Sequence, residues 1–219
     1  MAGLGFQFNQ QFLFDLVPRA AVLLLCLPIH EFAHAYAAYK LGDKTAAERG
    51  RLTLNPFAHL DLIGSALLLF AGFGWAKPVP VRAEAFRHPR RGMALVAAAG
   101  PLSNILMATL IMAIFKVVNH SISVSFQARV IFEFIILINL ILAVFNLLPI
   151  PPLDGSKFFG AVLPDRFYFG MMRYERFVMI GLIALMLTGV LGDFIFNIAG
   201  RLFLFVDFIT RPIDMLMGG

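Results

Sequence analysis

Residues 13–39, LFDLVPRAAVLLLCLPIHEFAHAYAAY, decide the fold, because this stretch is long and apolar enough to cross a bilayer as one helix. It contains the pattern HEFAH, from His30 to His34. Residues four apart lie on one helical face, so both imidazoles can reach one zinc ion, and the intervening Glu31 is placed to take a proton from water. Polar side chains of this kind are costly in lipid, which indicates a functional site and suggests hydrolysis.

The composition supports a membrane location. Apolar residues make up 60% of the 219 residues and charged residues only 14%, and the mean hydropathy is +0.83. These values are far from those of soluble domains and predict an integral membrane protein. The only cysteine, Cys26, excludes an internal disulfide framework and a thiolate-rich metal site.

Further apolar runs cover residues 92–118, 130–149 and 177–200, and each is long enough to span a bilayer. A shorter run, 202–217, contains Asp207 and Arg211 and either spans the membrane or lies in its interface. Segment 62–76 is short and glycine-containing, which favours a re-entrant or interfacial segment. We predict an all-α polytopic membrane protein of four to six transmembrane helices, with a re-entrant or extended hairpin segment in the first cytoplasmic loop. It is expected to be a single domain over 1–219, with its core in about 13–160 and C-terminal helices in about 177–217.

The loop between the first two predicted spans is strongly basic. Its cationic residues are Lys40, Lys44, Arg49, Arg51, Lys77, Arg82, Arg87, Arg90 and Arg91. The positive-inside rule therefore places this loop in the cytoplasm and the N-terminus outside. The histidines would then lie about 9 to 15 Å below the cytoplasmic helix end, at 1.5 Å per residue. The same bias explains the net charge of +5, and no recognition module accompanies it, so we expect a lipid bilayer but no nucleic acid as partner.

A catalytic zinc ion normally has three protein ligands, so a third ligand is needed. Asp154 is the best candidate, since it lies in NLLPIPPLDG, residues 146–155, directly after a predicted spanning helix that ends at the depth of the histidines. The prolines forbid a regular helix there, and Gly155 permits a tight turn. One carboxylate and one hydroxide also neutralise a divalent ion, which suits a low-dielectric site. The alternative is a helix cap just outside the membrane.

Together, HEFAH and NLLPIPPLDG resemble the site-2 protease family of intramembrane zinc metalloproteases. GRLTLNPFAHLDLIG (50–64), GWAKPVPV (74–81) and AAAGPLSN (97–104) are similar to the compact prokaryotic branch that lacks PDZ and CBS domains. The resemblance implies that His30, His34 and Asp154 bind one Zn²⁺ per chain and that Glu31 activates the attacking water. It also implies that Asn146 holds the substrate backbone or polarises its carbonyl; the alternative is a helix-packing amide.

Lys77, Pro78, Val79, Pro80 and Val81 are expected to be extended, because each proline disfavours helix at the residue before it. The resemblance implies that such a segment approaches the active site and presents an unpaired edge to substrate, with residues 51–56 as the other half of a hairpin. A plain interfacial loop is the alternative. Asn104, in the GPLSN stretch, is a further substrate-binding candidate or else part of a helix-packing face.

The function implied is that of a zinc-dependent intramembrane endopeptidase in a prokaryotic cell membrane. It would hydrolyse peptide bonds within or near transmembrane segments of membrane-protein substrates, with the active site open to the cytoplasm. A membrane zinc or ion transporter and a catalytically silent scaffold are the alternatives. The interval 76–94 is too short for a peptide-binding domain, so control by a separate regulatory partner, by homo-oligomerisation or by prior trimming of substrate stays open.

Overall fold

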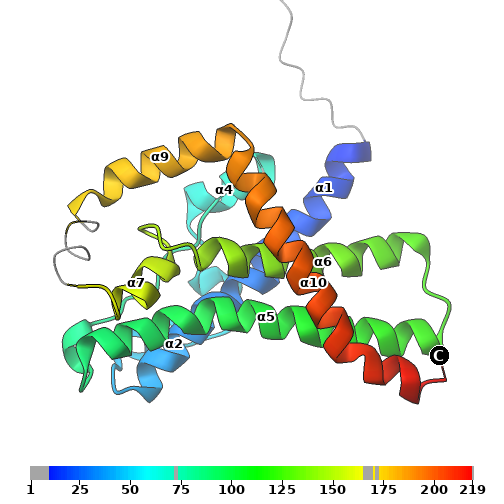
Figure 1. The fold of residues 1–219 in the computed structure, drawn as a ribbon, viewed down its shortest axis with the longest axis horizontal. Coiled ribbons are helices and arrows are strands. Elements are labelled where there is room, and N and C mark those ends of the chain that lie inside the picture. The colour runs from blue at the N-terminus through cyan, green and yellow to red at the C-terminus, as the bar shows by residue number, and fades with distance from the viewer. Residues whose placement is uncertain (1–9, 72–73, 165–169, 171–172, 219) are drawn as a thin grey trace, which may run out of the picture.

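The computed structural model describes residues 10–71, 74–164, 170 and 173–218, which form helices and irregular segments with no β-strand among them. The helices are α1 (Gln10–Ala21), α2 (Leu27–Lys40), α3 (Thr45–Glu48), α4 (Leu62–Ala71), α5 (Pro89–Ser121), α6 (Phe126–Asn146), α7 (Asp154–Gly160), α9 (Glu175–Leu187) and α10 (Val190–Leu216). Figure 1 shows α5 and α6 side by side, with α10 crossing both. The predicted all-helical architecture is confirmed.

Three described helices are long and apolar enough to cross a membrane: Leu16–Lys40, Pro89–Ser121 and Phe126–Asn146. A fourth span results if Ile180–Met186 and Val190–Leu216 count as one helix pair, bent by 77°. The total of up to four agrees with the lower end of the predicted range and with an integral membrane protein. The C-terminal boundaries differ from the prediction, because the chain breaks at Gly189, with φ 80°, and then continues as one helix through residues 200–202.

The first span is irregular just before the HEFAH pattern. Residues Val22–Cys26 form a π-helical turn, in which the N–H of Leu27 bonds to the carbonyl of Val22. Pro28 follows directly, lacks an N–H and would clash with the carbonyl four residues earlier in a regular helix. The wider turn accommodates this missing bond, and such turns are frequent at functional sites.

The main hydrophobic core lies where α5, α6 and α10 meet. Its buried side chains include Ala108 and Met112 of α5, Leu140 of α6, and Ala199 and Val206 of α10. The alanines, Ala108 and Ala199, let the helices approach closely, as small residues usually do in membrane proteins. Helix α2 packs along α5 of this three-helix unit (Figure 1).

The loop between the first two spans folds back toward α2. Helix α4 is too short to cross a bilayer, as predicted for segment 62–76, although residues 72 and 73 of that segment lie outside the described part. Leu60 and Ala76 form an isolated antiparallel bridge, and the N–H of Lys77 bonds to the carbonyl of His59 at 2.8 Å. The predicted pairing with residues 51–56 is therefore wrong: the backbone partner of the extended segment is His59–Leu60.

Candidate active site

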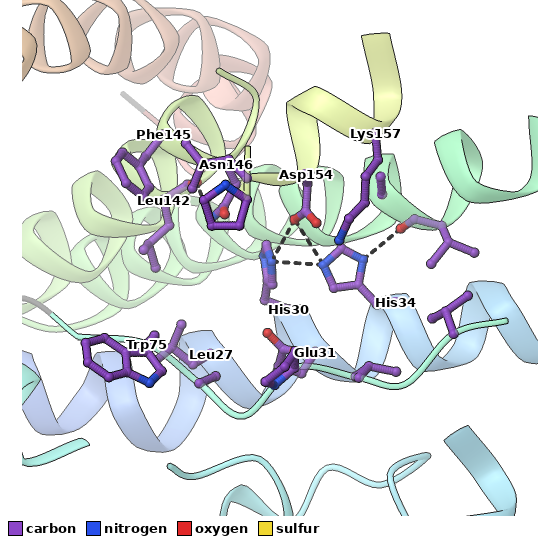
Figure 2. Close-up of a pocket in the computed structure, with 18 of the residues that line it drawn as sticks. Leu27, His30, Glu31, His34, Trp75, Leu142, Phe145, Asn146, Asp154 and Lys157 are labelled. Atoms are coloured by element: carbon purple, nitrogen blue, oxygen red, sulfur yellow. Dashed lines mark hydrogen bonds and ion pairs between the residues drawn. The ribbon is translucent and has the colours of Figure 1, made fainter. Parts of the chain in front are cut away.

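The side chains of His30, His34 and Asp154 converge on one point between α2 and α7 (Figure 2). Nε2 of His30 and Nε2 of His34 lie 3.0 Å apart. Oδ2 of Asp154 lies 3.2 Å from Nε2 of His30 and 3.1 Å from Nε2 of His34. Among the described residues, these three form the one group of histidine, cysteine and acidic side chains with metal-binding geometry.

This arrangement fits a zinc ion. Ligand atoms about 2.0 to 2.1 Å from a tetrahedral zinc lie about 3.3 Å from one another, close to the distances between these three atoms. Three protein ligands would leave the fourth position for water or substrate, which is the pattern of catalytic rather than structural sites. Both imidazoles are buried, and the Asp154 side chain is only 13% exposed.

Asp154 reaches this position because the chain leaves the α6 helix and turns sharply before α7 begins. Gly155 allows the turn, since a Cβ atom there would lie 2.3 Å from the carbonyl oxygens of Leu147 and Leu148. Its φ is not positive. Glycine is therefore needed in this tight turn because the backbone approaches closely, and not because of a left-handed conformation.

Helix α5 orients both histidines from behind. Nδ1 of His34 lies 2.7 Å from the carbonyl oxygen of Val96, and Nδ1 of His30 lies 3.2 Å from the amide nitrogen of Asn104. Between these contacts, the bare face of Gly100 lies against both rings: a Cβ atom there would be 2.4 Å from Nε2 of His34. These α5 residues are spaced by four and share one helical face.

A cavity of about 710 Å³ opens in front of the site. Its lining residues are Leu27, His30, Glu31, His34, Gly74, Trp75, Ala76, Pro78, Val79, Val81, Met93, Val96, Ala97, Leu142, Phe145, Asn146, Pro152, Leu153, Asp154 and Lys157. Glu31 thus lies in the same cavity as the three ligand atoms, and in Figure 2 it lies beside the extended segment. The lining is mostly apolar with a few convergent polar groups, which is typical of ligand sites.

The structure separates the residues predicted to bind substrate. Asn146 lines the cavity and donates one amide N–H to the carbonyl of Leu142 at 3.0 Å. Pro78, Val79 and Val81 also line it, whereas Lys77 and Pro80 are not among its lining residues. Asn104 is fully buried behind His30 and does not line the cavity, so its surroundings favour a role other than substrate contact.

Residues 77–82, here termed the strap, are anchored at both ends by side chains that the sequence did not single out. The buried guanidinium of Arg51 donates to the carbonyl of Lys77. At the other end, the carboxylate of Asp43 accepts from the N–H of Arg82 at 2.7 Å, and Nε of Arg82 donates to the hydroxyl of Thr45 at 2.7 Å. The sequence carried no local signal for these contacts, because they join residues far apart in the chain.

Both anchors are buried charged groups. Burial lowers the pKa of the Arg51 guanidinium. The negative charge of Glu31 opposes this effect but does not cancel it. Burial would by itself raise the pKa of Asp43, but hydrogen bonds from Arg82 and Thr45 and the charge of Arg82 outweigh this and lower the pKa. Asp43 is therefore held as a charged acceptor.

Similarity to known proteins identifies the family to which a chain with this site belongs. The sequence profile of peptidase family M50 matches residues 18–189. The chain belongs to peptidase family M50, the site-2 protease family. Among similar proteins, the "Putative zinc metalloprotease YwhC" of Bacillus subtilis (strain 168) is 40% identical over 187 residues, which covers 83% of this chain and 85% of the relative.

Two mycobacterial M50 relatives are also similar. The "Putative zinc metalloprotease Rip2" of Mycobacterium tuberculosis (strain ATCC 25618 / H37Rv) is 33% identical over 82% of this chain and 70% of its own length. The protein of the same name from Mycolicibacterium smegmatis is 34% identical over 69% of this chain and 57% of its own length. No solved structure matches significantly. This M50 peptidase is therefore a zinc metalloprotease and an integral membrane protein with a Zn²⁺ cofactor.

Proposed function

We propose that this M50 peptidase is an intramembrane endopeptidase that hydrolyses peptide bonds within or near transmembrane segments of membrane-protein substrates. The observation that carries the proposal is the convergence of His30, His34 and Asp154 beside Glu31, in a cavity between apolar helices. A soluble protease has no need to place such a costly polar group inside membrane-length helices. The basic first loop further supports a cavity that opens to the cytoplasm, with the N-terminus outside.

In the proposed mechanism, His30, His34 and Asp154 would hold a zinc ion, which when bound would supply Lewis-acid chemistry at the site. Glu31 takes the proton from the attacking water and returns it to the leaving amine. The amide of Asn146 donates one N–H to the carbonyl of Leu142, and among the described residues this is its one side-chain hydrogen bond, so its second N–H and its oxygen would bind the substrate backbone.

A transmembrane helix shields its own peptide bonds, so the substrate must be unwound before attack. The strap offers a solution, because extended backbone can pair with an extended substrate and satisfy its N–H and C=O groups in lipid. Pro78 and Pro80 keep the strap extended, and Val79 and Val81 line the cavity. The surrounding apolar side chains would accept the substrate's own apolar residues.

The first test is metal content of the detergent-purified protein. Wild type and Glu31→Gln are expected to hold one zinc per chain, whereas His34→Ala and Asp154→Ala are expected to lose it. Undiminished zinc in Asp154→Ala contradicts the third-ligand assignment. The absence of zinc from all four well-folded proteins contradicts the metal site as a whole.

The second test is cleavage in liposomes. The enzyme would be co-reconstituted with single-pass membrane proteins, with unfolded casein as a soluble comparison, and the products mapped by mass spectrometry. We expect cuts within or beside the transmembrane segments, and Glu31→Gln should be slower by at least about 10²-fold, since it lacks the base. Cleavage of casein alone contradicts intramembrane specificity, and wild-type activity in Glu31→Gln contradicts the assignment of the base.

A further inference from the structure

The amide of Asn104 has an unusual environment for a buried polar group. The side chain is fully buried, and its Nδ2 lies 3.2 Å from Nδ1 of His30. Its oxygen, Oδ1, has no hydrogen-bond partner among the described residues. A buried acceptor without a partner is costly, so its position beside a candidate metal ligand needs an explanation.

The orientation of this amide depends on the protonation of His30. If Nδ2 of Asn104 donates to Nδ1, the single proton of the neutral imidazole lies on Nε2, which then cannot bind a metal ion. When Nε2 binds zinc, the proton lies on Nδ1, and two donors would face each other. Rotating the side-chain amide of Asn104 by about 180° exchanges its oxygen and its nitrogen, which are similar in size. Oδ1 then accepts the hydrogen bond from Nδ1–H of His30.

The second histidine shows the same principle with a fixed acceptor. The carbonyl oxygen of Val96 lies 2.7 Å from Nδ1 of His34 and can only accept a hydrogen bond. It therefore holds the proton of His34 on Nδ1 and leaves Nε2 free for a metal ion. Val96 and Asn104 lie on either side of Gly100, which packs against both rings. One face of α5 thus serves both imidazoles.

We propose that Asn104 is a positioning residue that accepts the Nδ1–H of His30 and thereby holds Nε2 of His30 ready to bind zinc. The proposal rests on the proposed zinc site, and it assigns Asn104 a role different from substrate binding. Partners of this kind orient the imidazole and raise its basicity, and their loss typically weakens metal binding about 10- to 100-fold.

The test measures the zinc dissociation constant by competition with a chelator. Asn104→Leu, which keeps the volume but lacks an acceptor, is expected to bind zinc about 10- to 100-fold more weakly. Asn104→Asp, which can only accept, should bind at least as tightly as wild type. Asn139→Leu is the matched control, because Asn139 is also fully buried and its oxygen has no partner in the described part of the chain, but its N–H groups bond to Cys26 and Ile135 instead of a histidine.

The thermal midpoints of the metal-free proteins separate a positioning role from a structural one. Asn104→Leu and Asn139→Leu should have similar midpoints without metal, while only Asn104→Leu loses zinc affinity. Wild-type affinity in Asn104→Leu, or equally weak binding in Asn104→Asp, overturns the proposal. If Asn104→Leu does not fold, Asn104→Ala replaces it in the same comparison with Asn104→Asp. A wild-type protein that binds no zinc contradicts the proposed function itself, which keeps the two failures distinct.

Discussion

Gly100 shows how much of the site depends on a single missing side chain. A Cβ atom at this position would lie 2.4 Å from Nε2 of His34 and 2.6 Å from Cε1 of His30, closer than real Cβ contacts. Both rings are already buried against α5 and have little room to retreat. A methyl group at residue 100 must therefore push the imidazoles away from the point where their nitrogens converge.

We predict that Gly100→Ala weakens zinc binding by at least about tenfold, because metal ligands tolerate displacements of only about half an ångström. Gly200→Ala is the control. Gly200 lies on a different helix, α10, and a Cβ atom there would have no neighbouring atom of the described residues within 4 Å. The measurement is chelator competition on both purified proteins. Equal zinc affinity in the two variants would show that α5 does not position the rings.

The sequence predicted the residues whose chemistry is recognisable in isolation. HEFAH carries its own spacing, and Asp154 could be found because an acidic side chain after prolines at membrane depth is rare. The structure brings these groups together with Glu31, although their roles as ligands and base stay predictions. Val96 could not be found in this way, because it acts through a backbone carbonyl that any residue would supply.

At the scale of elements, the strap is the part of the cavity wall that is held by long-range contacts. Its extended conformation was predictable from its two prolines, which restrict the residues before them. Its anchors were not, because the contacts of Arg51 with Lys77 and of Asp43 with Arg82 depend on how the loop folds back. The same fold-back explains why residues 51–56 do not pair with the strap through their backbone.

We predict that Asp43→Asn loosens the strap and lowers thermal stability, with a pH dependence that identifies the carboxylate. Because the folded-state pKa of Asp43 is lowered, its contribution is fully present above the unfolded value of about 3.9 and is lost as the pH falls through the lower folded value. The difference in thermal midpoint between wild type and Asp43→Asn should therefore be constant from pH 8 to 5 and shrink below about pH 4.

Thermal unfolding in detergent across this pH range checks the prediction. Glu48→Gln is the control, since Glu48 is an exposed acid on the adjacent α3 helix and its loss makes the same change in charge. We also expect zinc content to be unchanged in Asp43→Asn, because the strap carries none of the three proposed ligands. A pH-independent difference would indicate that the charge of Asp43 does not anchor the strap.

At the scale of the whole molecule, an ionic contact between a buried lysine and two partly exposed carboxylates joins α5 to α10. Nζ of Lys116 on α5 lies 2.9 Å from Oδ1 of Asp207 and 2.7 Å from Oδ2 of Asp214, both on α10. The sequence indicates only that Asp207 and Arg211 interrupt an apolar run, which fits either a span or an interfacial helix over residues 202–217. In the structure, Asp207 and Asp214 pair with Lys116, and α10 runs as one helix across α5 and α6 (Figure 1).

We predict that Lys116→Leu lowers the free energy of unfolding by about 1 kcal/mol, because Asp207 and Asp214 lose their shared cation but are partly exposed and keep contacts with Arg211 and His120. Adding Asp207→Asn and Asp214→Asn to the same chain should recover much of this loss, since the two carboxylate charges that lost their shared cation are then removed as well. Denaturant unfolding of the purified proteins measures both effects, and zinc content should stay at the wild-type value because the contact lies apart from His30, His34 and Asp154. Wild-type stability in Lys116→Leu would show that apolar packing alone holds α10 on α5 and α6. A triple variant no more stable than Lys116→Leu would show that the loss comes from the packing of the lysine stem, and not from the two carboxylates that lost their shared cation.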